Sequence, residues 1–471
     1  MRTDGIVIGA GVNELACAHY LARSGRRVVV LERGNGADAA SPETGWVPPR
    51  IARDLELERH GLAIYRPDPW AAAALADGGR LELWHDMARS VEAIRRLSPK
   101  DAAKWPEFCE RMARLARLLE ALYLAAPPKP TSRGLGDLAR LAGLGLRLRR
   151  LGRQGIEDLL RLLPMSVADL LDDWFESDAL KGVLGAAGVM HLRQGPRSGG
   201  TAFLFLHHHV GSPAGVFRPP ASNIGRVLRE LAGVEIRHGA EVARINAREG
   251  RATGVALSGG EEIVAPLIVS GADPRRTLLG LVDPGALDPD FVRAVRNIRC
   301  RGVVARVTLA LDRAPGFSTL VVAPSLDYLE RAYDDAKYGR VSKKPYLEAR
   351  CSDEKRVEVH MQYVPHEAAT GDGLGDIVAQ MLTEHLNRAV IAERRVHSPR
   401  DLEKLEGFPE GQAHHAELAL DQALWMRPVP ELAHYRTPVE GLFLCGPGMH
   451  PGGGIAGAAG YNCAQELAKG L

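Results

Sequence analysis

The stretch VIGAGVNELACAHYLARSGRRVVVLER, residues 7–33, decides the fold class of this chain. It continues a short apolar run, 6–8, that predicts a buried strand, and residues 13–24 then carry apolar side chains at helical spacing until Gly25 ends the helix. A second apolar run over 28–32 predicts another strand. Strand, glycine turn, helix and strand in this order predict a β-α-β unit and therefore an α/β domain with a parallel sheet.

The turn between the first strand and the helix has the glycines of a dinucleotide-binding site. Gly9 permits a tight turn, and Gly11 lets the backbone approach a pyrophosphate at the helix N-terminus. Glu14 stands where a third glycine normally lets the helix pack closely on the sheet, so we expect its side chain to point aside or to bind a sugar hydroxyl or water. Glu32 ends the second strand and is expected to accept the ribose hydroxyls. The alternative is an ordinary β-α-β turn without a ligand.

A second glycine-rich segment, GLFLCGPGMHPGGGIAGAAGYNCAQELA, covers residues 441–468. Its pattern predicts a strand over 441–445, a glycine loop, and a helix over about 454–469 that aims its N-terminus at a ligand. A NAD-binding domain needs no such element, whereas a flavin gains from amide groups and a positive helix end beside its N1/C2=O edge. The two segments together favour FAD over NAD.

The middle of the chain combines long helices with antiparallel strands. Helical spacing covers 83–126, 138–163 and a single stretch that begins with a capping box at Ser166 and runs to 188. Beyond residue 233 the pattern alternates, which predicts a three-stranded meander and then a buried strand over 267–270. Two further strands, 303–312 and 357–364, and helices filling 373–388 complete the expectation.

Composition narrows the class of protein. The chain has 471 residues, too many for one ordinary core, and its 45% hydrophobic and 25% charged residues are typical of a globular protein in water. A formal net charge of only +2 argues against nucleic acid as a partner. The six cysteines show neither a Cys-x-x-Cys pair nor zinc-ligand spacing, so we predict free thiols in a reducing compartment and no metal site. Neither a signal peptide nor a membrane-spanning run is seen, and we expect a cytoplasmic protein.

Residues 4–33 and 442–464 resemble the two FAD signatures of phytoene desaturase-like flavoproteins, in the amine-oxidase-like superfamily. GTAFLFLHHHVG (200–211) and VEVHMQYVPHE (357–367) are similar to the bacterial and mitochondrial phytoene dehydrogenase-related subgroup. The resemblance implies a glutathione-reductase-like Rossmann FAD domain with an interleaved α+β substrate domain. We expect the FAD domain to comprise 1–75, 200–275 and 435–471, and the substrate or lid domain to comprise 76–199 and 276–434.

The resemblance also implies which residues hold the cofactor. The backbone of Val242 is expected to hold the adenine, Gly271 follows the strand that flanks it, and the segment from His450 to Ile455 is expected to form the loop at the flavin edge. The predicted cofactor-binding residues are, in chain order, Gly9, Gly11, Val12, Asn13, Glu14, Glu32, Arg33, Val242, Gly271, Gly446, His450, Gly453, Gly454 and Ile455.

This sequence departs from the family pattern in three places. Glu14 replaces a glycine, the short segment after the second strand lacks a Gly-Gly turn, and GVFRPPASNIGRVL (215–228) lacks a glycine-rich turn near the flavin. These departures point to a subfamily with its own substrate.

The candidate catalytic residues are His207, His209 and Trp425. A flavin dehydrogenase needs little protein chemistry beyond alignment of the substrate and acceptance of a proton. The histidines follow an apolar strand-like run, where alternation points His207 and His209 the same way, one of them as a proton acceptor in the substrate cavity. Trp425 is expected to wall the pocket, and Arg427 to pair with a carboxylate or approach the flavin. The alternative for the histidines is a structural or exposed role.

The function that follows from these features is FAD-dependent dehydrogenation of a largely apolar, isoprenoid-like substrate by hydride transfer to flavin N5. Two alternatives stay open: an amine-oxidase-type flavoenzyme acting on a C–N bond, and a flavin-binding or flavin-less scaffold. No second dinucleotide turn is seen, so we expect electrons to pass to oxygen, a quinone or another protein. The arginine- and leucine-rich stretch 138–163 predicts either peripheral contact with the inner face of the membrane or the solvated face of a lid helix.

Overall fold

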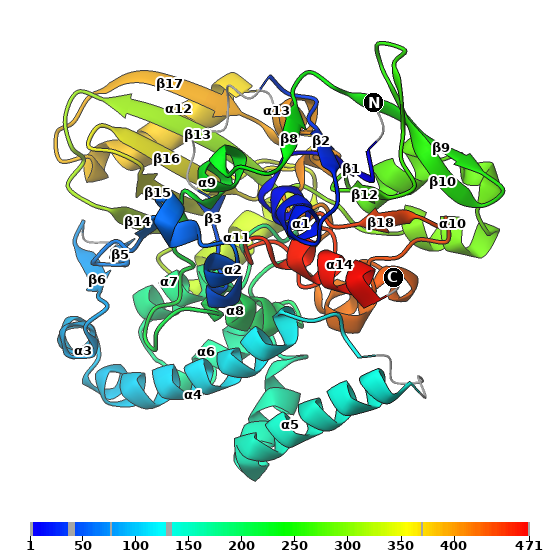
Figure 1. The fold of residues 1–471 in the computed structure, drawn as a ribbon. Coiled ribbons are helices and arrows are strands. Elements are labelled where there is room, and N and C mark those ends of the chain that lie inside the picture. The colour runs from blue at the N-terminus through cyan, green and yellow to red at the C-terminus, as the bar shows by residue number, and fades with distance from the viewer. Residues whose placement is uncertain (1–2, 36–42, 76–77, 129–133, 369–370, 470–471) are drawn as a thin grey trace.

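The computed structural model describes residues 3–35, 43–75, 78–128, 134–368 and 371–469 (Figure 1). Its first sheet has five parallel strands in the order β18-β12-β1-β2-β8, with Ile6 opposite Val29 on one side and Ile268 on the other. Every residue of β1 and β2 is buried, as in a parallel sheet covered on both faces. The α/β fold with a parallel sheet is therefore confirmed. The strands are β1 (Gly5–Ile8), β2 (Val28–Leu31), β8 (Glu235–Arg237), β12 (Ile268–Ser270) and β18 (Leu442–Leu444).

Two helices pack against this sheet and against each other. They are α1 (Val12–Arg23) and α14 (Ala458–Lys469). They approach so closely at Gly460 that a Cβ there would lie 1.8 Å from the carbonyl oxygen of Asn13. Segments from the two ends of the chain thus lie side by side at the sheet (Figure 1).

The predicted meander is confirmed beside the parallel sheet. Its strands pair antiparallel in the order β11-β10-β9. The strands are β9 (Val242–Arg248), β10 (Arg251–Leu257) and β11 (Glu262–Val264). The helix α10 (Pro289–Arg296) packs on the helical turn Arg276–Leu281, which contacts β9, whereas α9 (Ile224–Glu230) packs on α1.

A second, mixed sheet has seven strands in the order β17-β13-β16-β15-β14-β5-β6. The predicted strands at 303–312 and 357–364 are confirmed as its second and third strands, β13 and β16, which pair antiparallel, and α12 packs on one face. The elements are β5 (Ala71–Ala74), β6 (Arg80–Leu83), β13 (Val304–Leu311), β14 (Thr319–Val322), β15 (Leu347–Cys351), β16 (Arg356–Gln362), β17 (Ile391–His397), α11 (Leu326–Lys337), α12 (Gly371–Leu382) and α13 (Pro399–Glu406).

Helices α3, α4, α6, α7 and α8 form a layer on the other side of the seven-stranded sheet, and α5 packs on α4 outside this layer (Figure 1). The stretch predicted as one helix from Ser166 to residue 188 is two helices, because the chain turns extended at Phe175 and a new N-cap begins at Ser177. The segment before the three histidines is also helical rather than strand-like. The helices are α3 (Met87–Arg95), α4 (Pro99–Tyr123), α5 (Leu135–Leu162), α6 (Val167–Trp174), α7 (Asp178–Ala187) and α8 (Thr201–His209).

A further, small sheet has the strand order β3-β7-β4, and α2 follows β3 along the chain. These elements are β3 (Glu43–Thr44), β4 (Ile64–Tyr65), β7 (Ala221–Ser222) and α2 (Pro49–Asp54).

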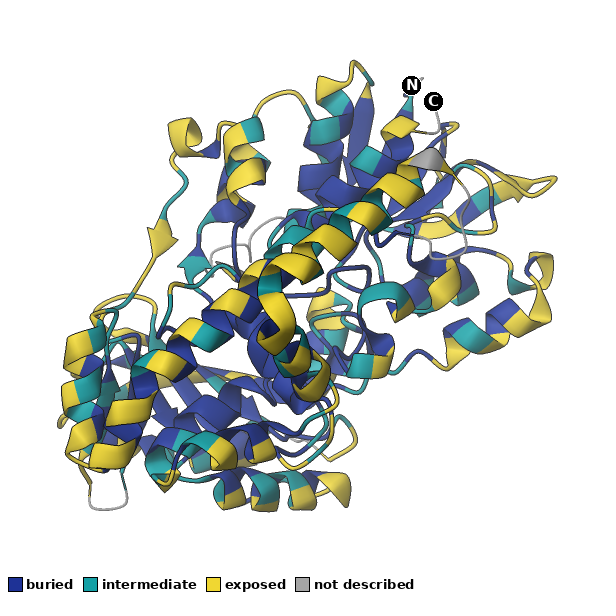
Figure 2. Ribbon diagram, turned by 90° about the horizontal axis from the view of Figure 1, so that it is seen from below, coloured by how far each residue is buried: buried dark blue, intermediate teal, exposed yellow. Residues whose placement is uncertain are grey.

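The predicted helix at 138–163 is confirmed as α5, although its path breaks at Gly152, where φ is 72°. It lies apart from both sheets and is mostly exposed, whereas the strands of the parallel sheet are buried (Figures 1 and 2). Among the residues that the structure describes, no helix is both long and apolar enough to cross a bilayer.

Candidate cofactor site

Three glycine loops meet at the carboxyl edge of the parallel sheet, where ligands of open α/β sheets bind. They follow β1, β12 and β18, and the backbone ties them together: the amide of Gly271 donates to the carbonyl of Ile8 at 2.9 Å, and the amide of Cys445 donates to that of Ser270 at 2.9 Å. A Cβ on Gly446 would lie 2.3 Å from the carbonyl oxygen of Gly271. The loop after β18 therefore needs a glycine for its close approach to the loop after β12.

The loop after β1 delivers the N-terminus of α1 to this edge. Gly9 has φ of 95°, a conformation that favours glycine, and α1 begins at Val12 with Gly11 as an N-cap that has no side-chain hydrogen bond. Within the described ranges, the amides of Gly11, Val12 and Asn13 have no hydrogen-bond acceptor. Such free amides at a helix N-terminus attract anions.

Glu14, in the first turn of α1, is buried at this edge, with only 5% of its surface exposed. Its side chain bends back over the loops. A Cβ on Gly11 would lie 2.5 Å from Oε2 of Glu14, and a Cβ on Gly446 would lie 3.4 Å from Oε1. A Cβ on Gly271 would lie 2.1 Å from both Cγ and Oε1 of Glu14. Gly271 thus leaves the space that Glu14 fills, and the carboxylate lies inside the ring of glycines instead of pointing aside.

The end of β2 provides a second carboxylate with a different role. Glu32 accepts hydrogen bonds from the amides of Ala10 at 2.8 Å and Gly34 at 2.7 Å, so it is fixed beside the glycine turn. Its backbone carbonyl accepts from the amide of Ala240 at 2.8 Å, which brings the start of β9, and with it Val242, next to the same edge. These positions agree with the predicted ribose and adenine contacts, which remain predictions.

Arg33 turns away from this edge. Its Nη2 donates to the carbonyl of Leu405 at 2.8 Å, near the C-terminus of α13. The structure therefore does not bring Arg33 together with the other predicted cofactor residues.

The predicted flavin-edge loop lies between β18 and α14. The amide of Trp46 donates to the carbonyl of Gly454 at 2.9 Å, and the amide of Ala456 donates back to Trp46 at 2.8 Å, so the loop is held as a short parallel bridge. In the part of the chain that the structure describes, the amides of Gly453, Gly454 and Ile455 have no acceptor, although Gly453 and Ile455 are buried. Buried amides are normally paired, so these three fit a ligand that accepts hydrogen bonds, as a flavin edge does.

His207 holds the same loop from the opposite side. Nε2 of His207 lies 2.8 Å from the carbonyl oxygen of Gly453, and Nδ1 lies 2.7 Å from the hydroxyl of Tyr123. A carbonyl only accepts, so Nε2 carries the proton and Nδ1 accepts from Tyr123. Burial lowers the pKa of His207 well below its ordinary value, and the imidazole is neutral. Since its accepting nitrogen is already bonded, His207 positions the loop and is not placed as a free proton acceptor.

His209 points elsewhere, which corrects the strand-based prediction. On α8, successive side chains are about 100° apart, so His207 and His209 face different surroundings. His209 donates from Nδ1 to the carbonyl of Val216 at 2.7 Å and stacks on Phe217, with 4.5 Å between ring centroids. A uniformly apolar run has no period that separates helix from strand, which is why the prediction was wrong.

Trp425 lies in a 3₁₀ turn, Leu424–Met426, which precedes β18 and its glycine loop in the chain. Its Nε1 donates to the carbonyl of Pro128 at 2.7 Å, at the end of the segment after α4. No contact of Trp425 with the predicted cofactor residues is seen among the described residues, and its role as a pocket wall stays a prediction.

Arg427 is fully buried, and its guanidinium donates only to backbone carbonyls. The acceptors are those of Met449, Glu417, Gln422, His414, Ala416 and Pro447. Among the residues that the structure describes, it pairs with no carboxylate, contrary to one of the two roles considered for it. Arg427 instead joins the segment 414–422 to the loop 447–449 that precedes the flavin-edge loop.

Two groups at this site are not among the predicted site residues. Tyr123 comes from the last turn of α4, far along the chain from the glycine segments, and its apolar surroundings carry no motif. His414 lies directly on the flavin-edge loop, because a Cβ on Gly453 would be 2.0 Å from its Cδ2, and His191 lies 4.6 Å from it between ring centroids. The adjacent pair of histidines at 414–415 was the one available signal. His415 packs on Phe408, with 5.9 Å between ring centroids, and burial lowers its pKa to about 4.

His450, the predicted first residue of the flavin-edge loop, is buried beside Tyr123. Its Nε2 lies 3.1 Å from the carbonyl oxygen of Leu122, and its own carbonyl accepts from the hydroxyl of Tyr435 at 2.7 Å. These contacts make His450 an anchor of the loop.

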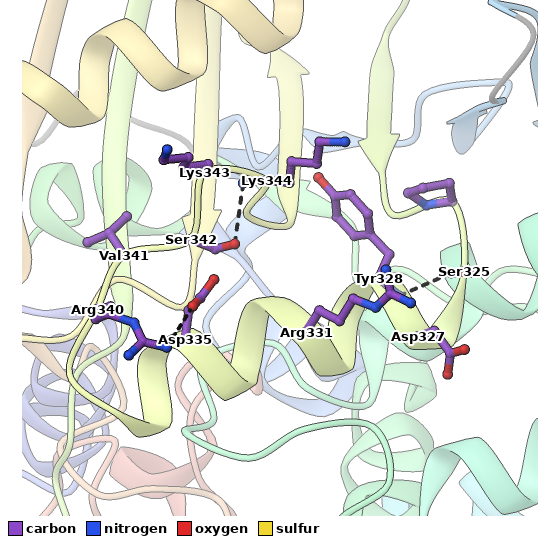
Figure 3. A pocket seen from close by; sticks show the side chains of 11 residues that line it. Ser325, Asp327, Tyr328, Arg331, Asp335, Arg340, Val341, Ser342, Lys343 and Lys344 are labelled. Carbon is purple, nitrogen blue, oxygen red and sulfur yellow. Dashed lines mark hydrogen bonds and ion pairs between the residues drawn. The ribbon is translucent and has the colours of Figure 1, made fainter.

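A separate cavity of about 700 Å³ lies between α11 and the segment 340–344 (Figure 3). Arg331, Arg340, Lys343 and Lys344 surround it, and Arg340 pairs with Asp335 at 3.2 Å. None of the predicted cofactor or catalytic residues lines this cavity.

Comparisons with known proteins agree with this site. The family described as FAD dependent oxidoreductase matches residues 4–192. The chain is 31% identical to pyridine nucleotide-disulfide oxidoreductase domain-containing protein 2 of Mus musculus, over 99% of this chain and 94% of that protein. It is 26% identical to a limonene dehydrogenase component of Castellaniella defragrans, over 99% and 95% of the two chains. Among solved structures, a triple mutant of putrescine oxidase has the same fold, with a TM-score of 0.63, 14% identity and coverage of 100% and 99%.

Proposed function

Since the chain belongs to the family of FAD-dependent oxidoreductases that includes phytoene desaturase-like and amine-oxidase-like flavoproteins, we propose that it binds FAD and dehydrogenates a largely apolar, isoprenoid-like substrate. The observation that carries this proposal is the set of amides at Gly453, Gly454 and Ile455, in the loop before α14, which have no acceptor among the described residues although Gly453 and Ile455 are buried. The similarity to a component of limonene dehydrogenase supports oxidation of an isoprenoid hydrocarbon.

FAD fits the residues at the carboxyl edge of the sheet in three places. The free amides at the start of α1 suit a pyrophosphate, the fixed carboxylate of Glu32 suits ribose hydroxyls, and the loop amides suit the N1/C2=O edge of the flavin. Bound FAD supplies the chemistry, because its N5 accepts a hydride from a C–H bond. Glu14 is the one group that does not suit an anionic ligand here.

The chain itself orients the flavin-edge loop. His207 donates to the carbonyl of Gly453 and is itself held by Tyr123, and the neutral imidazole of His207 adds no positive charge beside the loop. Burial also lowers the pKa of His414 well below its ordinary value, so the ring that covers Gly453 is neutral. Two neutral imidazoles beside this loop suit a substrate without charge.

A second candidate is oxidation of a C–N bond. The shared fold with putrescine oxidase favours it, although a sequence identity of 14% supports a common fold and not a common substrate. The two functions differ in the substrate that reduces the flavin. When the FAD-loaded protein is mixed without oxygen with a monoterpene hydrocarbon or with an alkylamine, we expect the flavin absorption to bleach with the hydrocarbon. Bleaching with the amine alone would favour C–N oxidation, and bleaching with neither would favour a scaffold role.

The electron acceptor and the membrane contact are also part of this proposal. Oxygen, a quinone or another protein would take the electrons. The exposed, arginine-rich α5 would hold the protein at the inner face of a membrane, close to a lipid-soluble substrate. The place of action would then be the cytoplasm.

A further inference from the structure

The place of Glu14 inside the glycine ring bears on how this chain binds its cofactor. Parallel strands β1, β12 and β18 all end at this edge, and the carboxylate of Glu14 lies where their loops converge: 3.5 Å separates its Cγ from a Cβ on Gly9, and its Oε2 lies 2.5 Å from a Cβ on Gly11. The positive end of α1 favours a negative charge at this position. The same end would favour the pyrophosphate of a dinucleotide.

We propose that Glu14 is a built-in anion of the cradle, which competes with the pyrophosphate for the N-terminus of α1 and weakens FAD binding by this chain. This inference rests on the proposed function, because it presupposes FAD as the ligand. Two effects add. The carboxylate repels the like charge of the diphosphate in a poorly hydrated setting, and its volume fills space close to the backbone that a glycine at this position leaves open.

Gly271 makes the arrangement possible. With any side chain at 271, its Cβ would lie 2.1 Å from Cγ of Glu14, so one of the two residues would have to move. The two residues are therefore matched: the carboxylate is accommodated because the loop after β12 has no side chain there. A substitution on the surface would leave its side chain in solvent. Glu14 instead has only 5% of its surface exposed and fills the space beside Gly271.

The direct test is FAD binding, measured by the change in flavin fluorescence during titration of the purified full chain. Glu14→Gly removes charge and volume, and Glu14→Gln removes charge alone. We expect Glu14→Gly to bind FAD about tenfold more tightly than the wild type or better, because the repulsion between two like charges a few ångströms apart at a buried site is worth about that much. We expect the FAD affinity of Glu14→Gln to lie between those of the wild type and Glu14→Gly. The gain from wild type to Glu14→Gln measures the effect of charge, and the further gain to Glu14→Gly measures the effect of volume.

The outcomes separate this inference from the proposed function. Equal FAD affinity of the wild type and Glu14→Gly would overturn the role of Glu14 and leave the proposed function in place. Absence of FAD binding in all three proteins, each shown by circular dichroism to be folded, would overturn both.

A second measurement checks the position of Glu14 without any ligand. Gly271→Ala should lower the melting temperature of the wild type, and the drop should be clearly smaller in the Glu14→Gly background, where the clash is gone. An equal drop in both backgrounds would show that Glu14 does not occupy this space and would overturn the inference.

Discussion

His207 donates a hydrogen bond from Nε2 to the carbonyl of Gly453, 2.8 Å away, and so connects the helix α8 to the loop that follows β18. The two residues are 246 positions apart in the chain. One belongs to a helix buried among the apolar residues below the second sheet, the other to the glycine loop at the edge of the first sheet. The bond fixes the loop whose amides are proposed to face the flavin.

Replacing His207 should therefore affect cofactor binding. We expect His207→Phe to destabilise the protein by about 1–3 kcal/mol, because the carbonyl of Gly453 and the hydroxyl of Tyr123 both lose a buried partner. FAD affinity should fall several-fold, since the loop is less well fixed. Urea unfolding and fluorescence titration measure the two effects. His209→Phe is the matched control: it removes a buried bond to Val216 from the same helix and should lower stability alone. Equal FAD affinity in both variants would contradict the positioning role.

The close approach of α1 and α14 predicts a strong effect at Gly460. A Cβ there would lie 1.8 Å from a backbone oxygen, which cannot move without displacing α1. Gly460→Ala should cost at least about 1–3 kcal/mol in urea unfolding, the usual range for an overpacked core. Gly143→Ala in the exposed α5 is the control, because nothing lies within 4 Å of its Cβ, and it should be neutral or stabilising. A neutral Gly460→Ala would show that the helices are farther apart than described.

Acid should unfold this protein in a particular pH range. Burial lowers the pKa values of His208, His209, His360, His415 and His450 to about 4 from an ordinary value of 6.5. The unfolded chain then binds more protons than the folded one below pH 6.5. The stability that these neutral rings contribute is complete above that pH and is lost as the pH falls through 6.5 towards 4.

Urea unfolding at several pH values between 7.5 and 4 measures this loss. His209→Gln should lessen the slope of the unfolding free energy against pH, because it removes one of the five groups. A free energy that stays constant from pH 6.5 to 4.5 would contradict the buried, neutral state of these rings.

Much of the cofactor site could be predicted from the sequence, because glycines at close approaches leave a local signal. Gly9 has φ of 95°, and Gly11, Gly271 and Gly446 each meet neighbours that a side chain would displace. The strands beside them are short and uniformly apolar. The orientation of Glu14 could not be predicted, since it depends on the missing side chain at 271, on a strand far along the chain.

The second sheet and the histidines were harder to predict for a related reason. β5 is a run of four alanines, Ala71–Ala74, with little strand preference of its own, and its pairing with β6 and β14 makes it a strand. Likewise, Tyr123 reaches His207, and His414 reaches Gly453, only through the packing of α4 and of the segment before Arg427. The local sequence pattern does not indicate such contacts, because they join residues that are far apart in the chain.

The central claim is that the chain holds FAD at the edge formed by β1, β12 and β18. The most direct measurement is the visible absorption spectrum of the purified protein after addition of FAD and removal of unbound cofactor. The account predicts the bands of oxidised flavin at a stoichiometry approaching one FAD per chain when FAD is supplied in excess. A spectrum without flavin bands, in both the wild type and Glu14→Gly, would contradict it.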